Sequence, residues 1–337
     1  MIDTFHITDN SQANQVFFCT GSGTTAAWQT WSKPSNCNYV HMILIGGGAG
    51  GQGGEIGTGG AGGVTRDGGY GGGSSSITYI TYPSFVLPDV LYIKVGQGGK
   101  GGAASTTAGL DGDAGTLSYV SVLPDSTTAL NIIGASGNAA AGTTTSNVAG
   151  TAFLASQILL AQFAIVSSVV GQAGGARGIS SGAAGSITPT GIPLTSGAGG
   201  SGVSGVGTLG SSGSITGFLF SPLLAGGISD KTLGGTEGQH GFSTRKNFSN
   251  INQLLPMFFT GGSGGGAGDT SPGANGGNGA FGSGGGGGGG GQGSERRSAG
   301  GRRRECCGGR WPCISSSCRE AVSVPAPARG RSAARNT

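Results

Sequence analysis

Residues 39–54 read Tyr-Val-His-Met-Ile-Leu-Ile-Gly-Gly-Gly-Ala-Gly-Gly-Gln-Gly-Gly. The first seven are mostly apolar and partly β-branched, which is typical of a strand. The glycines that follow cannot bury side chains, but their N–H and C=O groups still need hydrogen-bond partners. Residues 91–102 repeat this order of apolar run and glycine tract. The pattern predicts strands that anchor glycine-rich segments.

Glycine dominates the composition, with 78 of 337 residues, against a usual share of about 7%. Flexible Gly/Ser-rich linkers are poor in β-branched and aromatic residues, whereas this chain carries such residues throughout. No strict Gly-X-Y phase survives, which excludes collagen. We therefore predict an all-β or irregular fold, in which extended glycine-rich strands of polyproline-II geometry pack side by side into an elongated body.

The composition divides the chain into three parts. Residues 1–45, with Trp28 and Trp31, predict a small β-rich head, and residues 46–294 predict a body of glycine-rich strands with loops. Residues 295–337 hold ten of the 18 Lys and Arg residues but only five glycines. We expect this tail to be disordered or to be frameshifted sequence, because glycine codons read out of phase give Arg, Ala, Glu, Val and Trp.

Two other interpretations of the tail remain open. An arginine-rich segment can order on RNA. Zinc binding would need paired Cys-x-x-Cys spacings, which Cys306, Cys307, Cys313 and Cys318 do not supply. We expect no nucleic-acid partner.

The first residues have neither a basic nor an apolar stretch of the kind that opens a secretory signal, so we expect synthesis and folding in a host cytoplasm. In that reducing compartment Cys19 and Cys37 are expected to be thiols rather than a bridge. Residues 151–170 are apolar but contain Gln157 and Gln162, and they barely reach the length of about 20 residues that a span needs. No membrane insertion is expected.

Gly46, Gly48 and Gly51 follow an apolar run at the spacing of a dinucleotide fingerprint. That fingerprint requires a helix next, but residues 49–73 are too rich in glycine to sustain one. We therefore expect no nucleotide site and no cofactor.

Other catalytic or metal-binding patterns are also weak. The histidines His6, His41 and His240 are far apart in the chain, and Asp111 and Asp113 suit a polar turn better than a calcium site. No convergent set of catalytic residues can be assembled, and we expect the protein not to be an enzyme.

Residues 228–258 hold the richest mixture of polar, charged and aromatic residues in the body. A solvated connecting loop is one interpretation, and a receptor-contact surface is the other. The candidate contact residues are His240, Phe242, Arg245, Lys246, Asn247 and Phe248.

Trp28-x-x-Trp31-Ser32-Lys33-Pro34, followed by Cys37, the run 39–45 and Gly46-Gly47-Gly48, resembles the glycine-rich domain of bacteriophage tail and tail-fibre proteins. Residues 92–102 are similar to the second strand and glycine tract of that family. The resemblance covers about residues 15–135, and the short hydrophobic strand that usually ends the family is missing.

The resemblance implies a virion component, a tail-fibre or adhesin-type protein that recognises a host surface. Its implied partners are other virion tail proteins and a bacterial surface receptor, either a glycan or an outer-membrane protein, with homo-oligomer formation possible. The alternative is a self-assembling glycine-rich filament or cell-surface structural protein.

Overall fold

The computed structural model describes residues 15–20, 27–57, 64–141, 148–190, 193–217, 223–243 and 258–292. They all belong to one compact unit, Met1–Arg303, and the second unit, Arg304–Thr337, contains no described residue. The described residues form strands, short 3-10 helices and no α-helix. The predicted all-β class is confirmed at this level.

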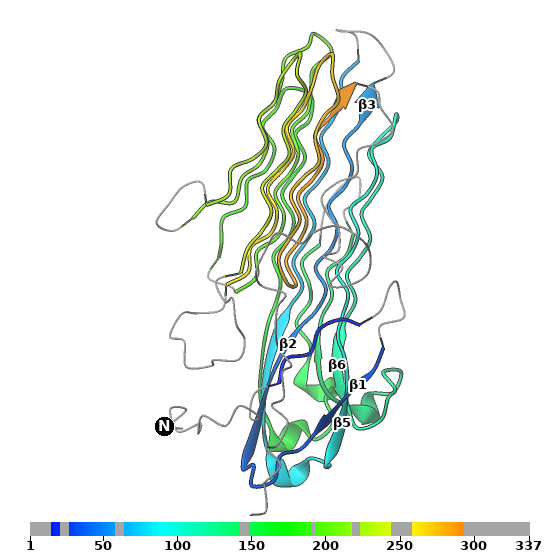
Figure 1. Ribbon diagram of the computed structural model, residues 1–337, viewed down its shortest axis with the longest axis vertical. Coiled ribbons are helices and arrows are strands. Elements are labelled where there is room, and N and C mark those ends of the chain that lie inside the picture. Colours follow the sequence, from blue (N-terminus) through cyan, green and yellow to red (C-terminus); the bar gives the residue numbers. More distant parts are fainter. Residues whose placement is uncertain are drawn as a thin grey trace, which may run out of the picture. The chain divides into compact units, whose positions relative to one another are not determined.

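Two antiparallel sheets form a sandwich (Figure 1). The first has the order β1 (Gln29–Ser32), β5 (Val90–Lys94), β6 (Ser118–Ser121), β7 (Ile132–Ser136). The second has the order β2 (Tyr39–Ile45), β4 (Ile77–Pro83), β8 (Ile165–Val169). The 3-10 helices are η2 (Ser84–Val86), η3 (Ala129–Asn131), η4 (Ala155–Gln157) and η5 (Ala161–Phe163).

Side chains from both sheets fill the sandwich. The buried set comprises Leu44, Ile80, Tyr82, Leu87, Leu91, Val120, Ile133 and Ile158. The Tyr82 hydroxyl donates to the carbonyl oxygens of Ile133 and Leu159, at 2.8 and 2.9 Å, and burial raises the pKa of this phenol. The buried Tyr82 hydroxyl therefore has hydrogen-bond partners inside the core and stays uncharged there.

The β-rich part extends beyond the head predicted at residues 1–45. β1 pairs with β5, and β2 pairs with β4, so the residues of the head strands find their partners 32 to 64 positions later. The physical reason is that two short strands cannot enclose a core. The apolar residues of β4, β5, β6 and β7 supply the rest of it.

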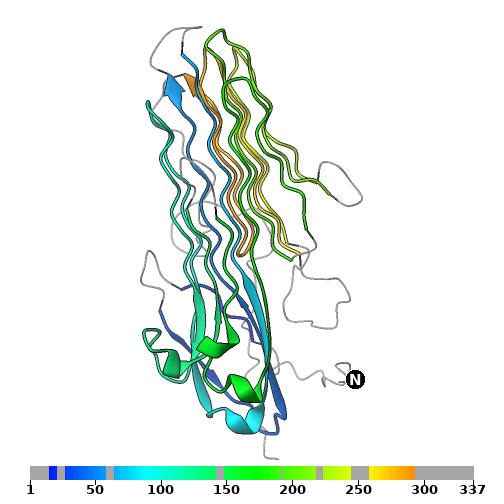
Figure 2. The same cartoon turned by 180° about the vertical axis from the view of Figure 1, so that it is seen from behind.

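Each sheet continues directly into a layer of glycine-rich segments. Residues 46–57, 64–76 and 171–179 extend β2, β4 and β8, and residues 96–105, 109–117 and 137–141 extend β5, β6 and β7. Further glycine-rich segments pack on the layer that extends β2, β4 and β8, as Figures 1 and 2 show. They comprise residues 182–190, 193–204, 208–217, 223–231, 234–243, 258–269, 272–281 and 283–292.

Hydrogen bonding in these segments repeats every three residues instead of every two. In 46–57, successive residues bond to three different neighbouring segments. Gly47, Gly50 and Gly53 donate to Thr116, Asp113 and Leu110; Ala49, Gln52 and Glu55 donate to Gly73, Tyr70 and Asp67; Gly48, Gly51 and Gly54 accept from Gly99, Gly102 and Ser105.

The glycines permit this packing. A Cβ atom at Gly48 or Gly51 would lie 2.2 or 2.3 Å from the carbonyl oxygen of Ser283 or Gly286. These two positions, and Gly46 with them, belong to the fingerprint-like spacing, and the described residues that follow, up to Gly57 and from Val64 to Ser76, form no helix. Close contacts with neighbouring backbone require glycine at these positions.

The longest glycine run, residues 284–291, lies in the segment with neighbours in the most directions. Its parallel pairing with residues 46–57 includes the short sheet of β3 (Ile56–Gly57) and β9 (Gly291–Gln292). The N–H groups of residues 285–292 donate to the carbonyl oxygens of Ala49, Gln52, Glu55, Ala198, Ser201, Ser271, Ala274 and Gly277. The carbonyl oxygens of the run accept the N–H groups of Gly69, Gly72, Gly262, Gly265 and Gly268.

Residues 151–170 contain η4, η5 and β8, and they close one side of the sandwich through Leu159, whose N–H donates to Ile132. Among the described residues, no helix has both the length and the apolar character that a membrane span requires.

Candidate functional site

Short connections join the glycine-rich segments at the end where β3 and β9 lie (Figure 1). We call them the tip turns: residues 105–109, 179–182, 204–208, 230–234 and 269–272. We call the stacked glycine-rich segments the bundle. The backbones of the tip turns are hydrogen-bonded to it; for example, the Ile56 N–H donates to the Ser105 carbonyl at 2.7 Å. They place non-glycine side chains outside a scaffold whose interior has little room for any.

Aliphatic side chains project from these turns. Leu233 is 89% exposed and Val206 is 83% exposed, the two highest values among the large apolar residues that the structure describes, and Ile179 is 59% exposed. Exposed hydroxyl residues such as Thr232 and Thr270 accompany them. A partner that covers such water-exposed apolar side chains lowers the free energy of the complex.

The 230–234 turn is held by a carboxylate. Asp230 Oδ1 accepts the N–H groups of Leu233 and Thr232, both at 2.8 Å. These bonds, that of Leu233 first, lower the pKa of Asp230 below its ordinary value. Gly234 completes the turn with a φ of +90°, a conformation that costs a glycine little.

The 204–208 turn uses different residues for the same purpose. The Gly207 N–H donates to the Ser204 carbonyl, and the Thr208 N–H donates to the Ser204 hydroxyl, both at 2.9 Å. Gly207 has a φ of +75°. Val206 is therefore carried on a turn that hydrogen bonds between Ser204 and the residues Gly207 and Thr208 close.

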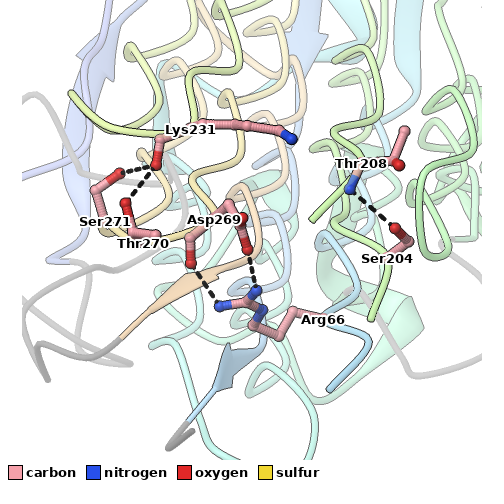
Figure 3. A network of polar contacts seen from close by, with 7 residues as sticks. All are labelled: Arg66, Ser204, Thr208, Lys231, Asp269, Thr270 and Ser271. Carbon is pink, nitrogen blue, oxygen red and sulfur yellow. Dashed lines mark hydrogen bonds and ion pairs between the residues drawn. The ribbon is translucent and has the colours of Figure 1, made fainter. Parts of the chain in front are cut away.

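Neighbouring tip turns are joined to one another. The Thr270 N–H donates to the Lys231 carbonyl oxygen at 3.0 Å. The Thr270 hydroxyl donates to the same oxygen at 2.7 Å (Figure 3). The 269–272 turn therefore supports the 230–234 turn. The Lys231 side chain remains exposed.

Charged residues lie beneath the turns. Arg66 pairs with Asp269 at 2.8 Å, and Arg177 pairs with Asp67 at 3.2 Å. Asp67 Oδ1 also accepts the N–H of Ser180, in the 179–182 turn, at 3.0 Å. These pairs connect turn backbones to the bundle.

Glu55 lies near both pairs, and burial raises the pKa of its carboxyl group. The charge of Asp67 adds to this, while the Asp67 N–H bond and the two arginines act in the opposite direction. The carboxylate bonds to backbone here, at 3.0 Å from Asp67 N, which fits a structural role.

The predicted receptor-contact residues divide into two groups. His240 and Phe242 lie on an extended segment of the bundle, not in a turn; His240 Nδ1 accepts the Asn278 N–H at 2.9 Å, and Phe242 is 38% exposed. Arg245, Lys246, Asn247 and Phe248 lie outside the described residues. The contact hypothesis for this group remains a prediction.

Sequence reasoning did not single out Val206 or Leu233. The signal available was the short interruption of glycine tracts, Ser204-Gly205-Val206 and Asp230-Lys231-Thr232-Leu233. The second interruption lies within the interval 228–258. Neither interruption contains an aromatic residue, whereas the predicted contact residues further along that interval include Phe242 and Phe248.

Within the described ranges, no cluster of three or more His, Cys, Asp or Glu residues is arranged to hold a metal ion. Asp111 accepts a hydrogen bond from the Gln52 amide at 3.1 Å, and His41 Nδ1 lies 2.8 Å from the Thr81 hydroxyl. Cys19 and Cys37 are not joined to each other by a disulfide.

No protein-family model matches the chain, and no curated protein matches it.

Proposed function

We propose that the protein is a tail-fibre or adhesin-type structural component of a bacteriophage virion and mediates recognition of the host surface. The sequence resemblance supports this role. In this proposal an elongated scaffold of polyglycine-II-like strands carries the tip turns, which contact a bacterial glycan or outer-membrane protein. The same proposal includes other virion tail proteins as partners and allows a homo-oligomer.

The observation that carries the proposal is the distribution of side chains. Backbone fills the bundle interior, whereas Val206 and Leu233 project from tip turns with most of their surface in water. Binding residues are commonly found on loops held by a rigid scaffold. Such preorganisation lowers the entropy lost on binding, so a few exposed side chains suffice for a useful contact.

Substitution of Val206 and Leu233 by Ser tests the proposal. Because both side chains are exposed, we expect folding to be unchanged and adsorption of virions to host cells to fall at least tenfold. Thermal unfolding checks the first expectation, and the adsorption rate constant checks the second.

Phe85 and Leu130 provide the matched control, since they are 82% and 73% exposed but lie in the 3-10 helices of the sandwich. Their replacement by Ser should leave adsorption unchanged. Equal adsorption by the tip variant and the control variant would refute recognition through these turns.

A separate variant tests the residues named from the sequence. Replacement of Phe242, Arg245 and Phe248 by Ala should reduce adsorption if that segment contacts the receptor. Normal adsorption of this variant, combined with a defect of the tip variant, would assign recognition to the tip turns.

A further inference from the structure

The threefold hydrogen-bond pattern creates a problem of axial register. Gly285, Gly288 and Gly291 donate to Ala49, Gln52 and Glu55, each at 3.0 Å. A shift of one segment by three residues would place each donor opposite an equivalent acceptor. Segments rich in glycine have few side chains to oppose that shift. In 258–269 the large ones are Phe259, which is buried with Ile77 and Leu194, and Asp269 at the other end of the segment.

Arg66 stands out against this background. It has the largest fully buried side chain among the described residues and is 2% exposed. Nη1 donates to the Asp269 carbonyl oxygen and Nη2 to Asp269 Oδ1, both at 2.8 Å (Figure 3). The two arms of one guanidinium therefore hold the backbone and the side chain of one residue.

The surroundings are shaped to this pair. A Cβ at Gly57 would lie 2.6 Å from Arg66 Cδ, and a Cβ at Gly207 would lie 2.3 Å from Asp269 Oδ2. The Arg66 backbone also exchanges two hydrogen bonds with Val203, at 2.9 and 2.7 Å. The pair therefore joins the segments 64–76, 193–204 and 258–269.

We infer that Arg66 and Asp269 are positioning residues that lock the axial register of the 258–269 segment. A slip of three residues moves a strand by about 9 Å, which would set Gly266 or Pro272 in the place of Asp269. Neither can neutralise a guanidinium, and a buried unpaired charge is strongly unfavourable. The paired geometry of Arg with a carboxylate is directional, so only one register satisfies it.

The lock also sets the positions of the tip turns. Asp269 begins the 269–272 turn, whose Thr270 binds the Lys231 carbonyl. The register of 258–269 thereby determines the height of the turn that carries Leu233. This link to recognition rests on the proposed function, whereas the lock itself does not.

The test replaces the pair by apolar residues of similar size, Arg66→Met with Asp269→Leu. Such exchanges of buried ion pairs often leave stability unchanged, so we expect a folded protein in more than one register. Two-dimensional NMR should show more than one amide peak each for Thr270 and Leu233. A single peak for each residue, at its native position, would overturn the inference.

The control exchanges an ion pair of the sandwich, Lys33→Met with Asp89→Leu, where Asp89 is 92% exposed and the nitrogen–oxygen distance is 3.0 Å. This variant should keep single tip peaks. If the Arg66→Met/Asp269→Leu variant does not fold, Arg66→Gln with Asp269→Asn decides, because it removes both charges but keeps polar side chains at both positions. A second set of tip peaks supports the lock, and one native set contradicts it.

Adsorption separates the lock from the proposed function. Mixed tip peaks with at least a tenfold loss of adsorption support both. Mixed tip peaks with normal adsorption leave the lock standing and remove recognition by the tip turns. Single native peaks refute the lock whatever the adsorption.

Discussion

The effect on stability of replacing glycine by alanine should differ sharply among the glycines of this protein, because the space for an added Cβ atom differs. At Gly286 a Cβ would lie 2.0 Å from the Ser263 carbonyl oxygen, whereas at Gly98 the nearest atom is 3.7 Å away. Both residues are glycines in extended segments. Their difference comes from their neighbours.

We therefore predict opposite effects of the same substitution. Gly286→Ala should destabilise by at least the 1–3 kcal/mol, in rough terms, that is typical of overpacked sites. Gly98→Ala should be neutral or stabilise by about 0.4–1 kcal/mol, because it restricts the unfolded chain. Chemical denaturation measures both values, and similar losses at the two sites would contradict the packing argument.

Acid should loosen the 230–234 turn. The pKa of Asp230 is lowered by its bonds from Leu233 and Thr232. The contribution of these bonds is complete above the ordinary pKa of an aspartate and is lost as the pH falls through the lowered value. The amide exchange rate at Leu233, corrected for the intrinsic effect of pH, should therefore rise as the pH falls over that range.

Asp230→Asn is the control for this titration, since an amide oxygen can still accept both N–H groups. Its Leu233 exchange rate, corrected for the intrinsic effect of pH, should not change over the same range. An identical acid response in the two proteins would show that another group controls the turn.

The threefold pattern of the glycine-rich segments makes the effect of a deletion depend on its length. Three residues complete one turn of such a strand, so removal of Gly287, Gly288 and Gly289 preserves the directions of the remaining donors. Removal of Gly287 and Gly288 alone rotates them toward the wrong neighbours. The three-residue deletion should have the higher melting temperature, and the reverse order would contradict the pattern.

Much of the strand content could be predicted from the sequence. Apolar runs at 39–45, 77–82 and 91–95 correspond to β2, β4 and β5. Alternating apolar residues specify such strands locally. The partners of the strands are not encoded locally: β1 pairs with β5, although about sixty residues separate them.

The candidate site was less predictable than the strands. Arg66 and Asp269 are 203 positions apart, and their pairing depends on how many segments stack between them. The exposure of Val206 and Leu233 likewise follows from where the segments end. Both the ion pair and the exposed side chains depend on how whole segments stack, and residue types alone do not specify that stacking.

For the molecule as a whole, the two ends of the described unit are stabilised by different forces. The sandwich buries aliphatic and aromatic side chains, and this hydrophobic stabilisation weakens on cooling. The bundle depends mainly on backbone hydrogen bonds. We predict that amide exchange in the bundle at Gly72, Gly265 and Gly288 is slow, with protection comparable to that of β4, when measured on the intact protein. Rapid exchange at these glycines would show that the bundle is not a rigid scaffold.

The position of residues 283–292 has a consequence for biogenesis. A ribosome releases this segment after every other described segment, yet it occupies the middle of the bundle, with earlier segments on several sides. The nascent chain must therefore keep its earlier glycine tracts from closing over the vacant centre until the last one arrives. Chaperones that hold the growing polypeptide open would serve that purpose, and a stop codon placed just before Ser283 should leave the bundle without its central segment.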